Sequence, residues 1–408
     1  MIQKFQEAGY DIVNFDEEAD IYVVNTCTVT NMSDRKSRQI LRRAKELNEK
    51  AIVVAVGCYV QVAKNEIDKI PEIDFTLGTN EKVNIVNNVE SFLENGQKIN
   101  IDDVLHNKNY GDFGDITYTE KTRAVIKVQD GCDRFCSYCI IPYARGRVRS
   151  RKPENVIKEI EDISKKGIKE VVITGIHVAS YGKDFNNQYR LIDLLEEINK
   201  IDGIVRIRLG SLEPKIITEE FMQRLIKLEK ICHHFHLSLQ SGCDNTLKRM
   251  NRKYTTSEFE EIVQRLRKYY NDVILTTDII VGFPGETEED FETTYNYLKK
   301  INFYKMHVFP YSPRKGTVAA KMPNQIQGDV KERRSKRLIE LSNENQKQYN
   351  QNLIGKDVDV LFEEKNKEGY YKGHTQNYLL VEYKTNKELE NQIVKVNIKK
   401  AELEYVIG

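Results

Sequence analysis

Residues 131–139 read GCDRFCSYC, and this stretch decides how the rest of the chain is interpreted. Its three cysteines, Cys132, Cys136 and Cys139, are spaced C-x3-C-x2-C and follow a predicted strand at 123–128. Three thiolates on a loop between a strand and a helix can bind three irons of a cubane iron–sulfur cluster and leave the fourth iron open to a ligand. Zinc is the alternative, but it takes four ligands, and the next fifteen residues contain no further Cys or His. The spacing therefore favours a cluster with an open iron.

The cysteine loop lies near the start of a long series of alternating strands and helices. Helical patterns, for example at 154–166 and 287–301, separate the apolar segments. Six units are fewer than the eight that close a full barrel, so we expect a partial (βα)6 barrel with its active site at the carboxyl ends of the strands. The six predicted strands are 123–128, 170–174, 205–209, 234–239, 273–281 and 304–309.

The segments on either side of the barrel have different patterns. Before it, continuous apolar strands alternate with helices, which indicates an open α/β domain with a parallel sheet. After it, short strands joined by turn residues indicate a small OB-like β-barrel. The predicted domains are 1–97, 118–340 and 341–408; the N-terminal strands are 20–25, 51–57 and 74–77, its helices 34–48 and 82–94, and the C-terminal strands 358–362, 370–374, 378–383, 393–399 and 402–406.

The amino-acid composition excludes some classes of protein but does not indicate a binding partner. Lys and Arg number 63 and Asp and Glu 62, so the net charge of +1 neither requires nor forbids a nucleic acid. Seven cysteines in a chain of 408 residues argue against a disulfide framework. The longest apolar run, 51–60, is about half the length needed to cross a bilayer, so we expect a cytoplasmic protein with no membrane partner.

Small and polar residues follow the predicted barrel strands. Because the carboxyl ends of parallel strands meet at one edge, these residues are expected to converge on one barrel mouth. Any single glycine among them could instead simply form a turn. The residues are Thr174 and Gly175, Ser211 and Glu213, Gln240, and Gly282.

Together these features resemble the radical S-adenosylmethionine (SAM) superfamily, which also has an aromatic residue, here Tyr138, before the last cysteine. In that family SAM chelates the open iron through its amino and carboxylate groups, and the reduced cluster cleaves it to methionine and a 5'-deoxyadenosyl radical. The resemblance implies that Tyr138 and the strand-end residues bind SAM.

Further motifs resemble the methylthiotransferases within that superfamily: Asn25-Thr26-Cys27, Val56-Gly57-Cys58, IIPYARG at 140–146, TGIH at 174–177 and VFPYS at 308–312. The resemblance implies a second 4Fe-4S cluster in the N-terminal domain, with Cys27 and Cys58 as ligands, and a C-terminal TRAM domain that binds RNA. The family's third N-terminal cysteine, in a Gly-Cys after an opening strand, is absent from this sequence. Residues 1–8 read as the end of a helix, so we expect about twenty residues upstream, and the second cluster is incomplete as given.

Four arginines follow the cluster loop at alternate positions: Arg145, Arg147, Arg149 and Arg151. In an extended segment all four would project to one face and could neutralise RNA phosphates. A solvated charge run is an equally good interpretation. Tyrosines in the last domain, such as Tyr371 and Tyr378, could stack on bases or fill its small core, and we favour the core.

The branch of the family that matches best acts on N6-threonylcarbamoyladenosine at position 37, in the anticodon loop of tRNA. The resemblance thus implies a tRNA methylthiotransferase that uses SAM, a reducing electron donor and a sulfur source. Two alternatives within the family are isopentenyladenosine tRNA and a ribosomal-protein aspartate as substrates. A noncatalytic RNA-binding iron–sulfur protein is an alternative from another class.

Overall fold

The computed structural model describes residues 1–98, 101–114 and 122–408. The chain divides into two compact units, which are considered separately here. The first contains the described part of Met1–Thr117 with Asp130–Arg149 and Ser312–Lys321, and the second contains the rest. The predicted domain limits 97, 340 and 341 fall on described residues, whereas 118 lies outside them.

The first unit has a three-stranded parallel sheet of order β1-β2-β3, formed by Ile21–Thr26, Ile52–Gly57 and Phe75–Leu77. Val53 and Ala55 of β2 pack with α2 (Asn31–Leu47) and α3 (Cys58–Val62), while Val54 and Val56 pack on the opposite face with α5 (Ile85–Asn95). A strand buried on both faces needs apolar residues at consecutive positions, as AIVVAVG at 51–57 provides. The smaller elements are α1 (Ile2–Glu7), α4 (Lys64–Ile67), η1 (Glu81–Asn84), α6 (Ile141–Arg145) and η4 (Ala319–Lys321).

The second unit contains the six predicted barrel strands. Together with the two-residue strand β5 they form two sheets, β5-β4-β6-β7 and β8-β9-β10. Single bridges such as Ile207↔Ile231 and Leu212↔Leu237 connect the two sheets. All strand pairs from β4 through β6 to β7, and from β8 through β9 to β10, are parallel. The bounds are β4 Arg123–Asp130, β5 Arg149–Ser150, β6 Glu170–Gly175, β7 Arg206–Leu209, β8 His234–His236, β9 Ile274–Val281 and β10 Lys305–Pro310.

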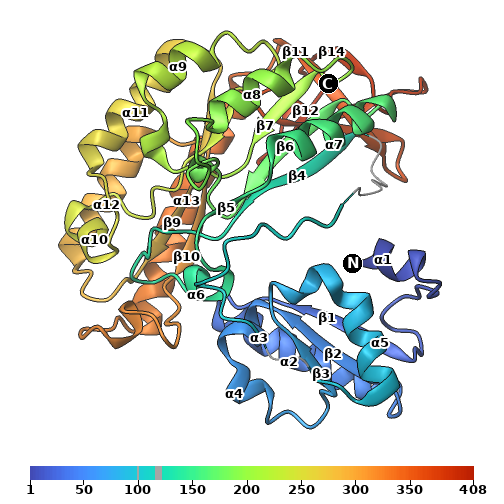
Figure 1. Ribbon diagram of the computed structural model, residues 1–408. Coiled ribbons are helices and arrows are strands. Elements are labelled where there is room, and N and C mark those ends of the chain that lie inside the picture. The colour runs from blue at the N-terminus through green and yellow to red at the C-terminus, as the bar shows by residue number, and fades with distance from the viewer. Residues whose placement is uncertain (99–100, 115–121) are drawn as a thin grey trace. The chain divides into compact units, whose positions relative to one another are not determined.

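Helices cover the outer side of these strands (Figure 1). The largest apolar core of the molecule lies between the helices and the strands, with Ala124, Ile173, Phe235 and Ile279 among its members. The expected partial α/β barrel is therefore confirmed. Its helices are α7 Pro153–Lys165, α8 Leu191–Asn199, α9 Glu219–Leu225, α10 Asp244–Arg249, α11 Thr256–Tyr269, α12 Glu288–Ile301 and α13 Gly328–Gln351, with short turns η2 Val178–Ser180 and η3 Pro214–Ile216.

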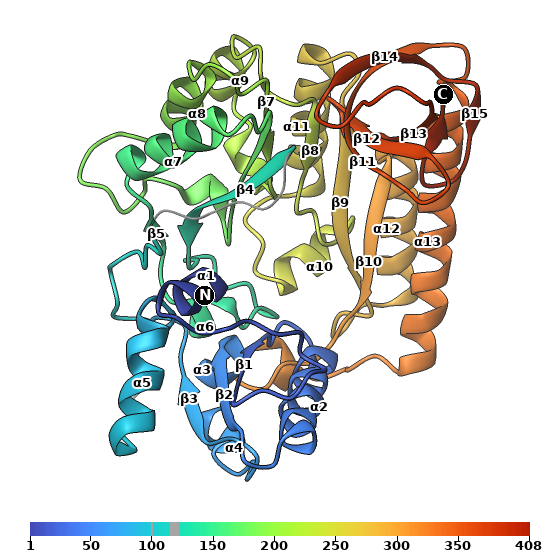
Figure 2. The ribbon, with the colours of Figure 1, turned by 90° about the vertical axis from the view of Figure 1, so that its right-hand side faces the viewer.

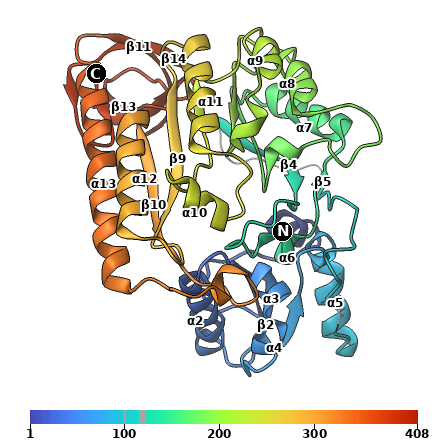
Figure 3. The same ribbon diagram turned by 90° about the vertical axis from the view of Figure 1, so that its left-hand side faces the viewer.

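Helix α13 leads from the barrel to the C-terminal sheet and runs beside α12 (Figures 2 and 3). The sheet is curled into a half-barrel of order β14-β11-β12-β13-β16-β15 and resembles a TRAM domain. The predicted strand 378–383 begins only at Leu380, because Tyr378 has a left-handed φ of +73° and belongs to the preceding turn. The bounds are β11 Asp357–Lys365, β12 Tyr370–Thr375, β13 Leu380–Lys384, β14 Ile393–Asn397, β15 Lys400–Ala401 and β16 Val406–Ile407.

The half-barrel is attached to the amino ends of the barrel strands by a buried ionic network. Glu170 Oε1 accepts hydrogen bonds from Arg123 Nε at 2.7 Å and from Arg208 Nε at 2.8 Å. Arg123 also pairs with Glu363 of β11 at 2.9 Å, and Arg206 donates to the carbonyl of His374 at 2.7 Å. Ile274 of β9 belongs to the apolar core of the half-barrel, so the two parts share both polar and apolar contacts.

No described helix combines the length and the apolar character needed to cross a membrane.

Candidate functional site

The three cysteines of the C-x3-C-x2-C motif lie on the loop between β4 and α6, in the first unit. The three cysteines form no disulfide and are partly exposed. The backbone N–H of Cys132 donates to Gly146 O at 3.0 Å, and that of Cys139 donates to Cys136 O at 2.9 Å. Tyr138 is half-buried on the same loop. Hydrogen bonds within the loop thus close it on itself.

Two backbone positions with positive φ give this loop its shape. Gly131 has a φ of +72°, and a Cβ there would lie 1.8 Å from the carbonyl oxygen of Arg147, so only glycine fits. Phe135 has a φ of +47°, which is uncommon for an aromatic residue, and its ring is held by Tyr143 and by the guanidinium of Arg147, 4.9 Å from the ring centroid. On the C-terminal side, Ala319 N donates to Ser137 O at 2.8 Å.

The loop fits a polynuclear cluster better than a single metal ion. Within the described ranges, no three Cys, His, Asp or Glu side chains are grouped so that they could hold one metal ion. A cubane cluster places each cysteine on a different iron, so its ligands need no common centre. Burial raises the pKa of the Cys132 thiol to about 11, although the N–H of Arg134 lies 3.5 Å from its sulfur.

Cys27 and Cys58 lie in the same unit, at the carboxyl ends of neighbouring parallel strands. Cys27 follows β1 and is exposed, and Cys58 begins α3 after β2 and is buried. Arg145, the last residue of α6, donates from Nε to Cys58 Sγ at 3.2 Å. The helix that follows the C-x3-C-x2-C loop therefore contacts the second pair of cysteines.

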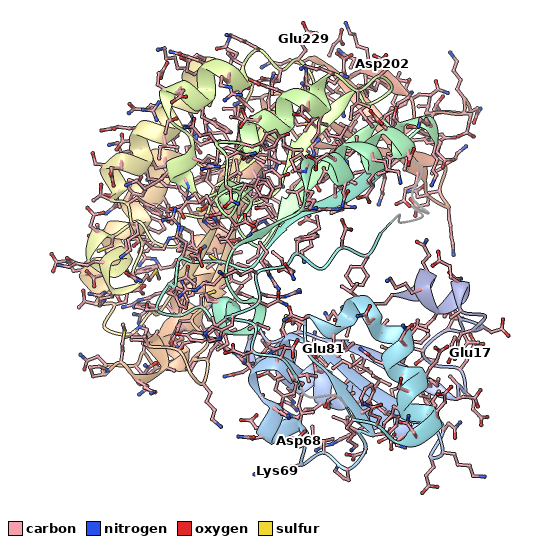
Figure 4. The ribbon with its side chains drawn as sticks, viewed as in Figure 1. Glu17, Asp68, Lys69, Glu81, Asp202 and Glu229 are labelled. Carbon is pink, nitrogen blue, oxygen red and sulfur yellow. The ribbon has the colours of Figure 1, made fainter. Side chains whose placement is uncertain are left out.

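The loop after β3 also contacts α6, through a hydrogen bond from Thr79. Thr79 Oγ1 donates to Ala144 O at 3.0 Å, and its N–H donates to Gln61 Oε1 at 3.0 Å. Glu81 Oε1 accepts from Asp102 N at 3.1 Å, and burial raises the pKa of Glu81. Figure 4 shows Glu81 within the N-terminal unit, whereas Glu17 lies at its periphery.

The expectation that four arginines share one exposed face is wrong. The segment is not extended throughout, because α6 continues to Arg145. Arg149 is 3% exposed and donates to Asn80 Oδ1 at 2.8 Å, and Arg151 is 6% exposed and pairs with Glu159. Only Arg147 is exposed, with a pair to Asp133 at 3.4 Å.

The residues predicted at the barrel mouth all follow barrel strands in the second unit. Thr174 and Gly175 end β6, and a Cβ at Gly175 would lie 2.8 Å from Gln129 O. Gln240 follows β8 with a φ of +75°, and its backbone bridges to β9 at Ile279. Gly282 follows β9 with a φ of +68°, and its N–H donates to Glu286 Oε1 at 2.9 Å.

Ser211 and Glu213, after β7, already have protein partners. Ser211 Oγ lies 2.8 Å from Ser238 Oγ, and Glu213 Oε2 lies 2.9 Å from His177 Nε2. The other ring nitrogen of His177 lies 2.6 Å from Ser180 Oγ. The sequence analysis did not assign His177 to the site. Its position two residues after Gly175, in the TGIH motif, is the signal that points to it.

Two family descriptions match parts of the chain, and one relative matches it along its whole length. The family description "Radical SAM superfamily" matches residues 126–298, and "Uncharacterized protein family UPF0004" matches residues 1–78. The chain is 41% identical to threonylcarbamoyladenosine tRNA methylthiotransferase MtaB of Bacillus subtilis over 412 residues, which cover 100% of this chain and 91% of that protein. The chain belongs to the radical SAM tRNA methylthiotransferases.

The chain is also similar to an enzyme named for another tRNA modification and, in fold alone, to a more distant radical SAM enzyme. The tRNA-2-methylthio-N(6)-dimethylallyladenosine synthase of Thermoanaerobacter pseudethanolicus is 40% identical over 367 residues, covering 88% of this chain and 77% of that protein. The radical SAM methyltransferase TsrM from Kitasatospora setae shares the fold alone, with a TM-score of 0.58, 16% identity, and coverage of 75% of this chain and 67% of that one.

As a radical SAM methylthiotransferase, the protein is an enzyme whose family uses a 4Fe-4S cluster and SAM. The expected fold class and family are confirmed. The roles of the individual cysteines, of Tyr138 and of the strand-end residues in binding the cluster and SAM stay predictions.

Proposed function

We propose that this methylthiotransferase converts N6-threonylcarbamoyladenosine at position 37 of tRNA to its 2-methylthio derivative. The observation that carries the proposal is the full-length match to the Bacillus subtilis enzyme named for that substrate, together with an intact C-x3-C-x2-C loop. With tRNA as its substrate, the enzyme is expected to act in the cytoplasm.

Cys132, Cys136 and Cys139 would hold the cluster that binds SAM. Tyr138, Thr174, Gly175, Ser211, Glu213, Gln240 and Gly282 are the proposed SAM contacts. The C2–H bond of adenine is not acidic, so a radical cofactor is needed to replace this hydrogen, and the bound cluster and SAM supply that radical. The protein's own task is to orient the two substrates and to exclude water from the reacting atoms.

Cys27 and Cys58 are the proposed ligands of a second cluster, and the hydrogen bond from Arg145 to Cys58 supports a role for this pair beyond packing. A hydrogen-bond donor at a cysteine sulfur is a common feature of iron–sulfur sites, because it tunes the cluster potential. A sulfur source and a reducing electron donor complete the proposed set of partners.

An anticodon-loop base is single-stranded, so it can enter a barrel mouth without the opening of a duplex. Arg147 is the proposed phosphate contact, since its guanidinium is 56% exposed. Arg145, Arg149 and Arg151 are engaged inside the protein and are not proposed as RNA contacts. In the C-terminal half-barrel Tyr371 is buried in the core, so it is not available for base stacking.

Dimethylallyladenosine in tRNA is the second candidate substrate, because a synthase for that modification is 40% identical. The deciding experiment is an anaerobic reaction of the reconstituted chain with SAM, a reductant, and tRNA that carries either modification. Mass spectrometry would measure the methylthio nucleosides and 5'-deoxyadenosine. A Cys139→Ala chain is the control for background cleavage of SAM.

Methylthio product on the threonylcarbamoyl tRNA alone would support the proposal. Product on the dimethylallyl tRNA alone would transfer the assignment to the second substrate. Absence of 5'-deoxyadenosine under strong reduction would overturn the radical mechanism for this chain.

A further inference from the structure

Helices cover one face of the sheet formed by β8, β9 and β10. On this face, Phe235, Ile279 and Met306 pack into the main core with the surrounding helices. Side chains alternate along a strand, so His236, Asp278 and His307 project from the opposite face. Asp278 and His307 are direct partners in the register of β9 and β10.

These three side chains form one polar cluster. His236 Nε2 lies 3.2 Å from Asp278 Oδ2, and the rings of His236 and His307 are 5.7 Å apart between centroids. His236 Nδ1 lies 3.0 Å from Thr276 Oγ1, which fixes the orientation of the imidazole. The His236 ring is thus held by a hydroxyl on one side and a carboxylate on the other.

The cluster is accessible rather than buried. The side chain of Asp278 is 31% exposed, and His307 is exposed. Within the described residues, the ring nitrogens of His307 have no hydrogen-bond partner. Phe309, two residues further on the same face of β10, is 48% exposed. This face therefore offers a free imidazole and a half-free carboxylate to a ligand.

The cluster forms one layer of side chains on this face of the sheet. Toward the amino ends of the strands, the ring of His234 packs 4.9 Å from Tyr378 of the half-barrel, which closes that end. Toward the carboxyl ends, the backbone N–H of Gln240 donates to Asp278 O at 2.9 Å, and Gly282 follows Asp278 by four residues. The cluster thus lies next to Gln240, one of the proposed SAM contacts.

We infer that His236, Asp278 and His307 form a specificity site for the N6 substituent of the target adenine. The inference rests on the proposed function, because it assigns recognition of the threonylcarbamoyl group to these three residues. With the adenine ring at the mouth, its N6 substituent extends toward this layer. Asp278 accepts a hydrogen bond from the substituent's hydroxyl or N–H, and His307 donates to its carboxylate.

The same chemistry selects against a dimethylallyl substituent. That group has no polar atom beyond N6, so it would desolvate the carboxylate and both imidazoles without replacing their hydrogen bonds to water. Sites that hydrogen-bond a substrate group reject an analogue that lacks it far more strongly than apolar pockets reject a small change in size.

The test measures binding of anticodon stem-loops that carry threonylcarbamoyladenosine, dimethylallyladenosine or plain adenosine at position 37. Fluorescence anisotropy on the full chain gives three dissociation constants for the wild type and for Asp278→Asn, His307→Phe and His307→Gln. We expect the wild type to prefer the threonylcarbamoyl loop, and Asp278→Asn and His307→Phe to reduce that preference about tenfold or more. Affinity for the plain loop should stay unchanged, and His307→Gln, which keeps a donor, should recover part of the preference.

His233 and Asp272 provide the matched control. They form a similar pair, with Nδ1 2.7 Å from Oδ1, but outside the cluster. His233→Phe and Asp272→Asn should leave the preference unchanged, and circular dichroism on all variants would detect misfolding.

A wild type that binds the three loops equally, or a preference that survives both Asp278→Asn and His307→Phe, would overturn the inference. Failure of the proposed function is a separate result, because it appears as absent methylthio product in the reaction assay. A preference without turnover would still establish the specificity site.

Discussion

Arg145 connects Cys58 to Asp130 through a single guanidinium. Its Nε lies 3.2 Å from Cys58 Sγ, and its Nη1 lies 3.3 Å from Asp130 Oδ2, at the start of the C-x3-C-x2-C loop. Burial alone would lower the pKa of Arg145, but the neighbouring Asp130 carboxylate and the Cys58 sulfur outweigh it and raise this pKa. The positive charge is thus held between a carboxylate and a sulfur that are far apart in the sequence.

Replacing Arg145 with Gln should lower the free energy of unfolding by about 2 kcal/mol, because Asp130 would lose a partly buried partner and Cys58 its donor. Urea denaturation of the reduced, metal-free chain measures this effect. Arg147→Gln is the matched control, since its pair with Asp133 is exposed and should contribute less than about 1 kcal/mol. An equal decrease in the free energy of unfolding in both variants would show that the buried contacts of Arg145 stabilise the protein no more than the exposed pair of Arg147.

Substitution of any one of the three loop cysteines by Ala should abolish cleavage of SAM to 5'-deoxyadenosine. Each thiolate holds a separate iron, so the loss of one opens a second position on the cluster. Iron analysis and mass spectrometry after anaerobic reconstitution provide the measurement. Cys232→Ala is the control, because Cys232 is buried in the second unit. Normal SAM cleavage by Cys136→Ala would contradict the assigned ligand set.

Gly131→Ala should disturb the loop while leaving every cysteine in place. Its Cβ would lie 1.8 Å from Arg147 O, so the loop backbone would have to move. We expect iron incorporation to fall severalfold. Gly167→Ala has a similar φ of +84° but no atom within 4 Å of the new Cβ, so it should cost only about 1 kcal/mol of backbone strain and keep its iron. Equal iron contents would show that the loop tolerates the shift.

Much of the fold follows from local patterns in the sequence. Apolar runs such as 51–57 predict β2 within one residue, because a parallel strand covered by helices on both faces must be apolar along its length. The cysteine spacing predicts the cluster loop for a similar reason, since its ligands are close in the chain. The positive φ angles of Gly131 and Tyr378, in contrast, cannot be predicted from the pattern of apolar and polar residues.

The parts that were predicted wrongly or not at all depend on distant partners. Arg149 and Arg151 alternate with Arg147 in sequence, but Asn80 and Glu159 bind them and remove them from the surface. The contact between Arg145 and Cys58 joins residues 87 positions apart. The cluster of His236, Asp278 and His307 likewise brings together three strands. His236 pairs with Asp278 of the neighbouring strand, a partner that the sequence pattern does not identify.

The buried network at Glu170 predicts a specific dependence of stability on pH. Burial alone would raise the pKa of Glu170, but Arg208 and Arg123 outweigh it and lower the pKa to about 2. In the unfolded chain the value is about 4.5. The stabilisation is therefore complete above about pH 4.5 and is lost as the pH falls through about 2, and its size is about 3 kcal/mol.

The free energy of unfolding of the wild type should exceed that of Glu170→Gln by an amount that shrinks by about 3 kcal/mol between pH 6 and pH 2. Urea denaturation, followed by circular dichroism at several pH values, measures this difference. Glu229, an exposed residue of the same unit, provides the control, and Glu229→Gln should follow the wild type at every pH (Figure 4). A difference that stays constant with pH would mean that Glu170 packs against the arginines without being charged, because only a carboxylate that titrates between the two states can give the predicted slope.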